Sequence, residues 1–184
     1  MPTPRSSVRI IGGRWRGTRI EVEAGTTVRP TGDRIRETLF NWLAPDVDGA
    51  RCLDLFAGTG ALGFEAVSRG AASACLVERD ATLVRALAAL GARLNAGEVQ
   101  VQRADALAWL TGRAEPYDIV FVDPPFATGL ATAVLERLAN GWLAAHGVVY
   151  LEQPHDAPEP AACWRVRKAG STRHVSYKLI ELTG

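Results

Sequence analysis

The stretch DLFAGTGALG, from Asp54 to Gly63, joins a short apolar segment to a helical pattern. Its glycines Gly58, Gly60 and Gly63 match the GxGxxG spacing, in which small residues let the backbone approach a ligand and the next helix offers free N–H groups. Alone the pattern is weak, because many nucleotide cofactors, or an ordinary tight turn, can use it. It predicts a strand, a loop and a helix at the start of an α/β sheet.

Strand-like and helix-like segments alternate from residue 51 onward. Predicted strands cover 51–56, 72–78, 99–103, 117–123 and 147–153, and predicted helices cover 61–70, 80–97, 105–112 and 129–143. Residues 163–182 predict a final β-hairpin with its turn near Gly170. Such alternation predicts a doubly wound, mostly parallel, seven-stranded Rossmann-like sheet that binds its ligand at the carboxyl ends of the central strands.

The N-terminal region has a different, basic character. Before Glu21 the chain carries five arginines and no acid. Residues 8–22 predict a short hairpin or extended arm, and a helix follows with Thr31 or Asp33 as its cap. We therefore divide the chain into an extension, 1–45, and a catalytic domain, 46–184. Basic arms often contact phosphate backbones, although a solubilising terminus has the same composition.

Composition limits the other classes. The 184 residues are 47% hydrophobic and 22% charged, which is ordinary for a soluble domain. No apolar run approaches the roughly 20 residues of a membrane span, and the N-terminus has no apolar signal core, so we expect a cytoplasmic protein and, by default, a monomer. Cys52 and Cys75 are expected to be buried free thiols, and no metal site is expected.

Acidic residues at three predicted strand ends help to identify the cofactor. Glu78 can accept both hydroxyls of a ribose, and Asp105 can accept a hydrogen bond from an adenine amino group or cap a helix. Asp54 precedes the glycine loop, where its carboxylate would repel a pyrophosphate but would suit a cationic amino-acid tail. These features favour S-adenosylmethionine over a nicotinamide dinucleotide.

The segment DIVFVDPPF, 118–126, places a carboxylate, two prolines and an aromatic ring after a buried strand. The Asp123 carboxylate and the Pro124 carbonyl can both accept from one planar amino group, since proline removes the following N–H. Phe126 supplies a face on which a base can stack. The segment therefore predicts a socket for a planar amine that receives a methyl group by direct in-line transfer.

Four motifs, RIIGGRWRG, RPTGDRIRETLFNWL, DLFAGTGALGFEAVSRGA and FVDPPF, in this order resemble the RsmD family, class I methyltransferases that modify a guanine N2 in bacterial 16S rRNA. A domain this small has little surface with which to read a sequence, so we expect the 16S rRNA to be bound within an assembled or assembling small ribosomal subunit. The resemblance implies three sets of site residues. These are the catalytic Asp123, Pro124, Pro125 and Phe126; the cofactor-binding Asp54, Phe56, Gly58, Gly60, Glu78 and Asp105; and the RNA-binding Arg9, Arg14, Arg16, Arg34 and Arg36.

Several alternatives stay open at this point. An Asp-Pro-Pro-Phe socket also suits DNA adenine or cytosine and a protein amide. A nicotinamide-dependent dehydrogenase or a non-catalytic RNA-binding protein would have no use for it. Arg36 can instead pair with nearby acids, and Trp15 can either stack on a base or pack under the arm. His174 and Tyr177 are interpreted as structural.

Overall fold

The computed structural model describes residues 7–21, 32–125 and 129–183. Its elements are β1 (Ser7–Arg9), the 3-10 turn η1 (Gly13–Trp15), β2 (Arg19–Glu21), α1 (Asp33–Trp42), β3 (Arg51–Asp54), α2 (Ala61–Ser68), β4 (Ser73–Glu78), α3 (Ala81–Leu94), β5 (Val99–Arg103), α4 (Ala106–Trp109), β6 (Tyr117–Val122), α5 (Leu130–Leu138), β7 (Leu143–Pro154), β8 (Trp164–Ser171) and β9 (Val175–Leu182).

The larger sheet has seven strands in the order β5-β4-β3-β6-β7-β9-β8. The first five strands in this order, β5, β4, β3, β6 and β7, pair in parallel. Strand β9 pairs antiparallel with both β7 and β8. The strand order reverses between β3 and β6, which makes the carboxyl ends of these two strands the topological switch point of the sheet. The structure therefore confirms the predicted doubly wound fold.

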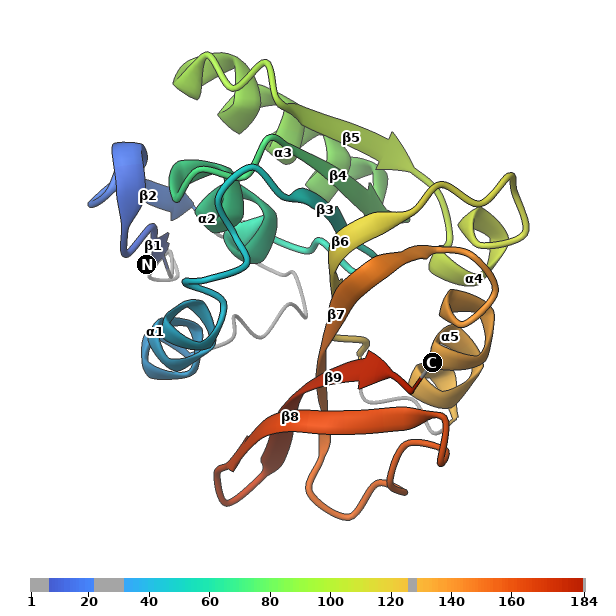
Figure 1. Cartoon of the computed structure of the whole chain (residues 1–184). Coiled ribbons are helices and arrows are strands. Elements are labelled where there is room, and N and C mark those ends of the chain that lie inside the picture. The colour runs from blue at the N-terminus through green and yellow to red at the C-terminus, as the bar shows by residue number, and fades with distance from the viewer. Residues whose placement is uncertain (1–6, 22–31, 126–128, 184) are drawn as a thin grey trace, which may run out of the picture.

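Helices cover both faces of this sheet (Figure 1). Helices α1, α2 and α3 contribute to one buried cluster, which also contains Phe121 and Tyr150 from the sheet. Helices α4 and α5 contribute to the other, with Val122 and Leu151. Because neighbouring residues of a strand point to opposite faces, this division fixes the face of each residue near the strand tips.

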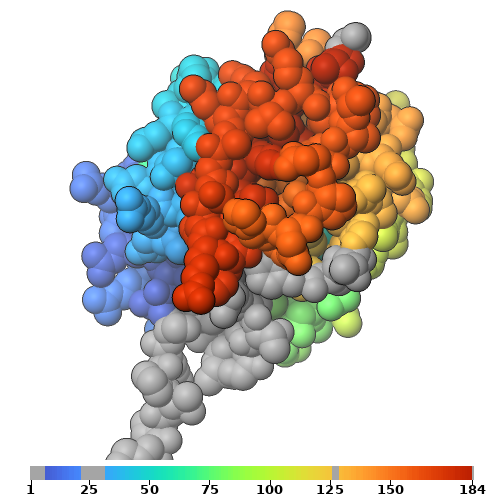
Figure 2. Space-filling view, turned by 90° about the horizontal axis from the view of Figure 1, so that it is seen from below, coloured from blue at the N-terminus to red at the C-terminus, as the bar shows by residue number. Residues whose placement is uncertain are grey.

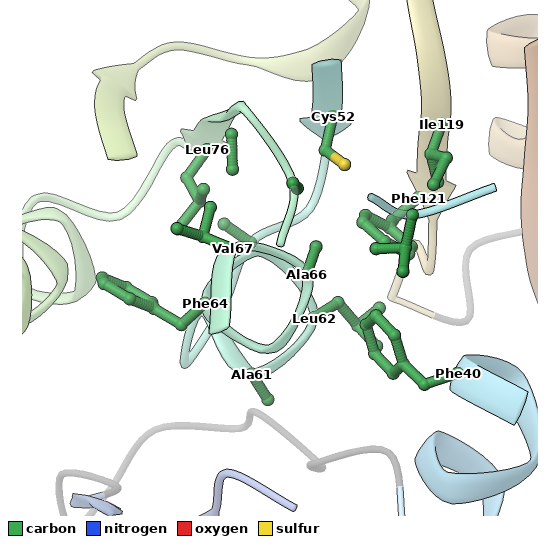
Figure 3. Packing of buried hydrophobic residues seen from close by; sticks show 14 of the residues in the cluster. Phe40, Cys52, Ala61, Leu62, Phe64, Ala66, Val67, Leu76, Ile119 and Phe121 are labelled. Atoms are coloured by element: carbon green, nitrogen blue, oxygen red, sulfur yellow. The ribbon is translucent and has the colours of Figure 1, made fainter. Parts of the chain in front are cut away.

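Helix α2 is enclosed on every side. All eight of its residues are buried, which its nearly all-apolar sequence requires. Figure 3 shows Phe40 of α1 and Phe121 of β6 converging near Leu62 of α2, and the two rings lie 6.1 Å apart. The helix that begins at the glycine loop is therefore held between the sheet and the N-terminal extension.

A buried carboxylate on α2 fixes the N-terminal extension. The Oε2 atom of Glu65 accepts from the Ile11 N–H at 2.7 Å, and Oε1 accepts from the Gly12 N–H at 2.8 Å. One turn later, the Ser68 hydroxyl accepts from the Trp15 N–H at 2.9 Å. The extension and the sheet also share a hydrophobic cluster, so the described residues 8–20 and 35–43 belong to the same packed core.

The C-terminal hairpin lies beside α1, as the red and cyan surfaces of Figure 2 show. Trp42 of α1 stacks on Tyr177 of β9 with ring centroids 5.5 Å apart. Arg167 also pairs with Asp46, with Nη2 and Oδ2 3.4 Å apart. The hairpin turn lies at 172–174, between β8 and β9, slightly beyond the position predicted near Gly170.

The structure corrects the predicted cap of α1. Asp33 is the first residue inside the helix, and Gly32 occupies the capping position with no side-chain hydrogen bond. Thr31 lies outside the described residues. Asp33 instead pairs with Arg36 three residues later, which is the spacing of neighbours on one helix face.

Other local predictions are confirmed. Asp80 caps α3, where it accepts from the N–H groups of Thr82 and Leu83. Cys52 and Cys75 are buried free thiols. Trp15 packs against Phe64 with ring centroids 6.2 Å apart, which favours packing under the arm. Among the described residues, no helix has the length and apolar character needed to cross a membrane.

Candidate active site

The glycine loop turns from β3 into α2. Gly60 is the residue before α2 and has φ +80°, a conformation that side-chain-bearing residues rarely adopt. A Cβ there would lie 2.5 Å from Cδ2 of Leu87. At Gly63 a Cβ would lie 2.6 Å from Cδ1 of Leu76 on β4, so this glycine lets α2 approach the sheet. The loop therefore needs its glycines for its own conformation and packing.

Glu78 at the end of β4 reaches the same loop. Its Oε2 accepts from the Gly58 N–H at 2.9 Å, and its Oε1 accepts from the Asp80 N–H at 2.8 Å. The carboxylate thus ties the glycine loop to the start of α3. Each oxygen retains a further lone pair, which is what a vicinal diol of a ribose requires.

Asp54 is the last residue of β3, and its side chain is almost completely buried. Burial raises the pKa of this carboxyl to about 7, although N–H groups of Phe56 and Gly63 act in the opposite direction. Its Oδ1 atom is buried without a hydrogen-bond partner. A buried, unpaired acceptor under the glycine loop suits a cationic or N–H-bearing ligand group.

Two other predicted cofactor residues flank this loop. Asp105 caps α4, and its Oδ1 accepts from the Leu107 N–H at 2.9 Å and the Ala108 N–H at 3.1 Å. The structure therefore bears out the capping role that the sequence allowed, and the adenine contact stays a prediction. Phe56 is half-buried and packs against the cluster under α4 and α5.

Asp123 and its prolines follow the neighbouring strand tip. Asp54, the last residue of β3, pairs with Phe121 of β6. Asp123 therefore lies two residues beyond the position that is level with Asp54, close to the glycine loop. Asp123 is half-buried, Pro124 is buried and Pro125 is exposed. Phe126 lies outside the described residues. The structure thus brings the predicted amine socket and the predicted cofactor loop together at one edge of the sheet.

The predicted RNA contacts divide into two groups. Arg9, Arg14, Arg16 and Arg34 are exposed. Arg14 also lies over the Trp15 ring at 4.2 Å and pairs with Glu98 at 2.9 Å. The sequence prediction fails for Arg36, whose side chain is fully buried.

The partners of Arg36 explain its burial. Its Nη2 donates to the Arg9 carbonyl at 2.8 Å and to Asp33, and its Nη1 lies 3.8 Å from Oε2 of Glu65. A guanidinium with these partners and no exposed surface does not reach a phosphate backbone. Arg36 instead holds the N-terminal arm, α1 and α2 together.

Sequence reasoning missed a pair of polar residues on β7. Tyr150 and Glu152 are both buried, and the Tyr150 hydroxyl donates to Oε2 of Glu152 at 2.7 Å. The signal was present, since VVYLEQ is an apolar strand whose end turns polar. The pair lies at the tip of the strand next to β6, on the same edge as Asp123.

Known proteins resemble this chain over nearly its whole length. A family model described as "Conserved hypothetical protein 95" matches residues 8–181. The chain is 44% identical to Ribosomal RNA small subunit methyltransferase D of Escherichia coli strain K12, over 95% of this chain and 89% of that protein. It is 38% identical to the protein of the same name from Haemophilus influenzae, over 98% and 96% of the two chains.

A solved structure gives the same result. The Escherichia coli protein yhhF superposes with a TM-score of 0.88 at 41% identity, covering 96% of this chain and 98% of that one. Sequence similarity and fold similarity thus both extend over nearly the whole molecule. The chain belongs to the RsmD family, the family of the model "Conserved hypothetical protein 95".

Proposed function

We propose that this protein transfers a methyl group from S-adenosylmethionine to the exocyclic N2 amine of a guanine in 16S rRNA of the small ribosomal subunit. The observation that carries the proposal is the pairing of β3 with β6, which sets the glycine loop beside Asp123 and Pro124. Relatives that carry the name Ribosomal RNA small subunit methyltransferase D support the substrate class.

The residues of the loop fit this cofactor. Gly58 and Gly60 would lie against its amino-acid portion, Glu78 would accept from its ribose hydroxyls and Asp105 would face its adenine. The unpaired Oδ1 of Asp54 fits an ammonium group, whose charge would favour the ionised carboxylate. Phe56 would line the same site. When bound, S-adenosylmethionine supplies an activated methyl group on a positively charged sulfur.

The DPPF motif, residues 123–126, would bind and orient the target amine. Asp123 and the Pro124 carbonyl would accept hydrogen bonds from the two N2 hydrogens, which orients the nitrogen lone pair. Pro125 would shape the turn, and Phe126 would stack on the base. The product nitrogen is acidic and can lose its proton to Asp123 or to water after transfer. The enzyme would act mainly by positioning and by charge complementarity, so it needs no strong base before attack.

The basic extension would supply substrate affinity. Arg9, Arg14, Arg16 and Arg34 would contact phosphates, which makes the extension, 1–45, the RNA-facing part of the molecule. A domain of this size has little surface with which to read a sequence. We infer that it recognises RNA shaped by proteins, within an assembled or assembling small subunit in the cytoplasm, and that it acts as a monomer.

The decisive experiment is methyl transfer from labelled S-adenosylmethionine to small subunits that lack their native methylations, followed by nucleoside analysis. We expect label in N2-methylguanosine at a single site. If subunits and free rRNA stay unlabelled although the protein binds S-adenosylhomocysteine, the proposal fails. A DNA amine or a protein amide would then be tested with the same labelled cofactor.

A further inference from the structure

Asp123 and Glu152 occupy adjacent positions at the tips of neighbouring strands. Val122 of β6 pairs with Leu151 of β7 in parallel register, and the next residue in each segment, Asp123 or Glu152, carries a carboxylate. Phe121 and Tyr150 belong to the cluster under α1 and α2, whereas Val122 and Leu151 belong to the opposite one. Alternation along each strand therefore places Asp123 and Glu152 on the α1 side of the sheet.

Among the described residues, the Glu152 carboxylate has one hydrogen-bond donor, the Tyr150 hydroxyl. The Glu152 side chain is only 7% exposed, and Oε2 accepts from the Tyr150 hydroxyl at 2.7 Å. Within the described part of the chain, the hydrogen bond from Tyr150 is made to Oε2 and not to Oε1. Burial raises the pKa of Glu152, and the hydrogen bond from Tyr150 opposes this shift only in part. A buried carboxylate is costly unless something donates to it, so Oε1 of Glu152 has acceptor capacity that suits a ligand N–H group.

Asp123 lies close to this pair. The pKa of Tyr150 is raised well above its ordinary value of 10, first by burial, then by Glu152, and also by the charge of Asp123. The two carboxylates therefore act on one small volume at the edge of the sheet. Any base amine held by Asp123 would have its neighbouring ring atom within that volume.

Tyr177 is the cross-strand neighbour of Glu152. The two residues are directly opposed in the β7–β9 pairing. The Tyr177 ring is stacked on Trp42, and it lies across Gly170, where a Cβ would be 2.4 Å from the ring. The ring is thus packed on both sides, next to the position of Glu152 on the neighbouring strand. The hydrogen bond from Tyr150 orients the Glu152 carboxylate, as a specificity contact requires.

The bases differ in what they present next to their amino group. Guanine carries the N1–H donor beside the N2 amine, whereas adenine and cytosine carry an unprotonated ring nitrogen beside theirs. A carboxylate accepts from the first and repels the lone pair of the second. We propose that Glu152 accepts the N1–H of the target guanine and so determines the choice of guanine over adenine and cytosine. This inference rests on the proposed function and names a further substrate contact for it.

The test compares guanine with 2-aminopurine at the mapped target position of reconstituted small subunits. The analogue keeps the 2-amino group but has no N1–H. We expect the wild type to prefer guanine by at least about a hundredfold in kcat/KM, because a site built to accept a hydrogen bond rejects an analogue that cannot donate it. Glu152→Gln introduces an N–H donor toward N1 and should lower this preference at least about tenfold.

Tyr150→Phe is the matched control. It removes the same buried hydrogen bond but leaves the carboxylate, so the preference for guanine should persist even if stability falls. A merely structural Glu152 would instead lower activity on both bases equally and leave their ratio unchanged. Thermal unfolding and S-adenosylhomocysteine binding would confirm that each variant is folded.

Each result has a clear meaning. Equal use of guanine and 2-aminopurine by the wild type overturns the inference without any variant. An unchanged ratio in folded Glu152→Gln overturns it as well. The absence of N2-methylguanosine in wild-type reactions with guanine would instead count against the proposed function, so the two failures are distinguishable.

Discussion

Nη1 of Arg36 lies 3.8 Å from Oε2 of Glu65, and both side chains are fully buried. The pair joins α1 to α2 beneath the N-terminal arm, and the same carboxylate accepts from two arm N–H groups. Since α2 begins at the glycine loop, the arm and the candidate cofactor site share one rigid support. Docking of the basic extension is therefore coupled to the geometry of the loop.

Glu65→Gln should destabilise the fold strongly. The amide NH2 would face the Ile11 or Gly12 N–H, and Arg36 would lose a buried counter-charge. Breaking buried pairs of this kind costs about 3 kcal/mol or more. Chemical unfolding of the wild type and the variant measures the difference in free energy.

Glu115→Gln is the control for that experiment. Its carboxylate pairs with Arg51 at 3.3 Å, but its side chain is 62% exposed. Exposed pairs contribute about 0.5 kcal/mol, so this variant should unfold close to the wild type. Comparable losses in both variants would show that the burial of Glu65 does not govern stability.

Arg16→Ala should weaken binding to the small-subunit rRNA and lower the slope of log affinity against log salt by about 1, because one phosphate contact is lost. Arg16 is exposed, whereas Arg14 is partly neutralised by Glu98, so Arg14→Ala should have the smaller effect. Filter binding over a salt series measures both.

Arg85→Ala provides the comparison for nonspecific loss of charge. Arg85 is also exposed, but it lies on α3, where its Nη2 donates to Thr82. We expect its salt slope to match that of the wild type. If Arg16→Ala and Arg85→Ala behave alike, the arm is not part of the RNA-binding surface.

The sequence predicts where strands end better than it predicts which polar side chains are buried. Glu78 and Asp123 were placed correctly at the ends of β4 and β6, the two strands that flank β3, because periodicity and parallel crossovers determine where strands end. The alternative pairing of Arg36 with a nearby acid is confirmed by Asp33. Its buried partner Glu65 was not predictable in this way, since Glu65 is distant in sequence and becomes a partner only after α1 packs on α2. Glu152 was missed for a similar reason, because its neighbour Asp123 comes from another strand.

Asp54 should make stability depend on pH. Its pKa is raised from 3.8 to about 7 by burial, so the folded state keeps a proton that the unfolded chain has lost. The unfolded chain then binds fewer protons, and the free energy of unfolding falls as the pH rises from about 4 to about 7. The resulting loss in the free energy of unfolding reaches up to about 4 kcal/mol at neutral pH.

Asp54→Asn tests that dependence, because the amide keeps an acceptor for the loop N–H groups but does not titrate. The variant should lose this part of the pH dependence and should be the more stable protein at pH 8. Unfolding curves between pH 5 and pH 8 give the comparison. Parallel pH profiles for the two proteins would mean that Asp54 titrates near its ordinary pKa.

Asp123→Ala should lower methyl transfer at least about a hundredfold and leave S-adenosylhomocysteine affinity nearly unchanged, because Asp123 is proposed to hold the amine and not the cofactor. Single-turnover transfer to unmodified small subunits and calorimetric binding measure the two quantities separately. Asp118→Ala is the matched control, since Asp118 lies on the same strand at the opposite edge, where its Oδ2 accepts from the Arg51 N–H at 2.8 Å. It should lose stability but retain transfer. Equal losses of transfer and cofactor binding in Asp123→Ala would assign Asp123 to the cofactor site instead.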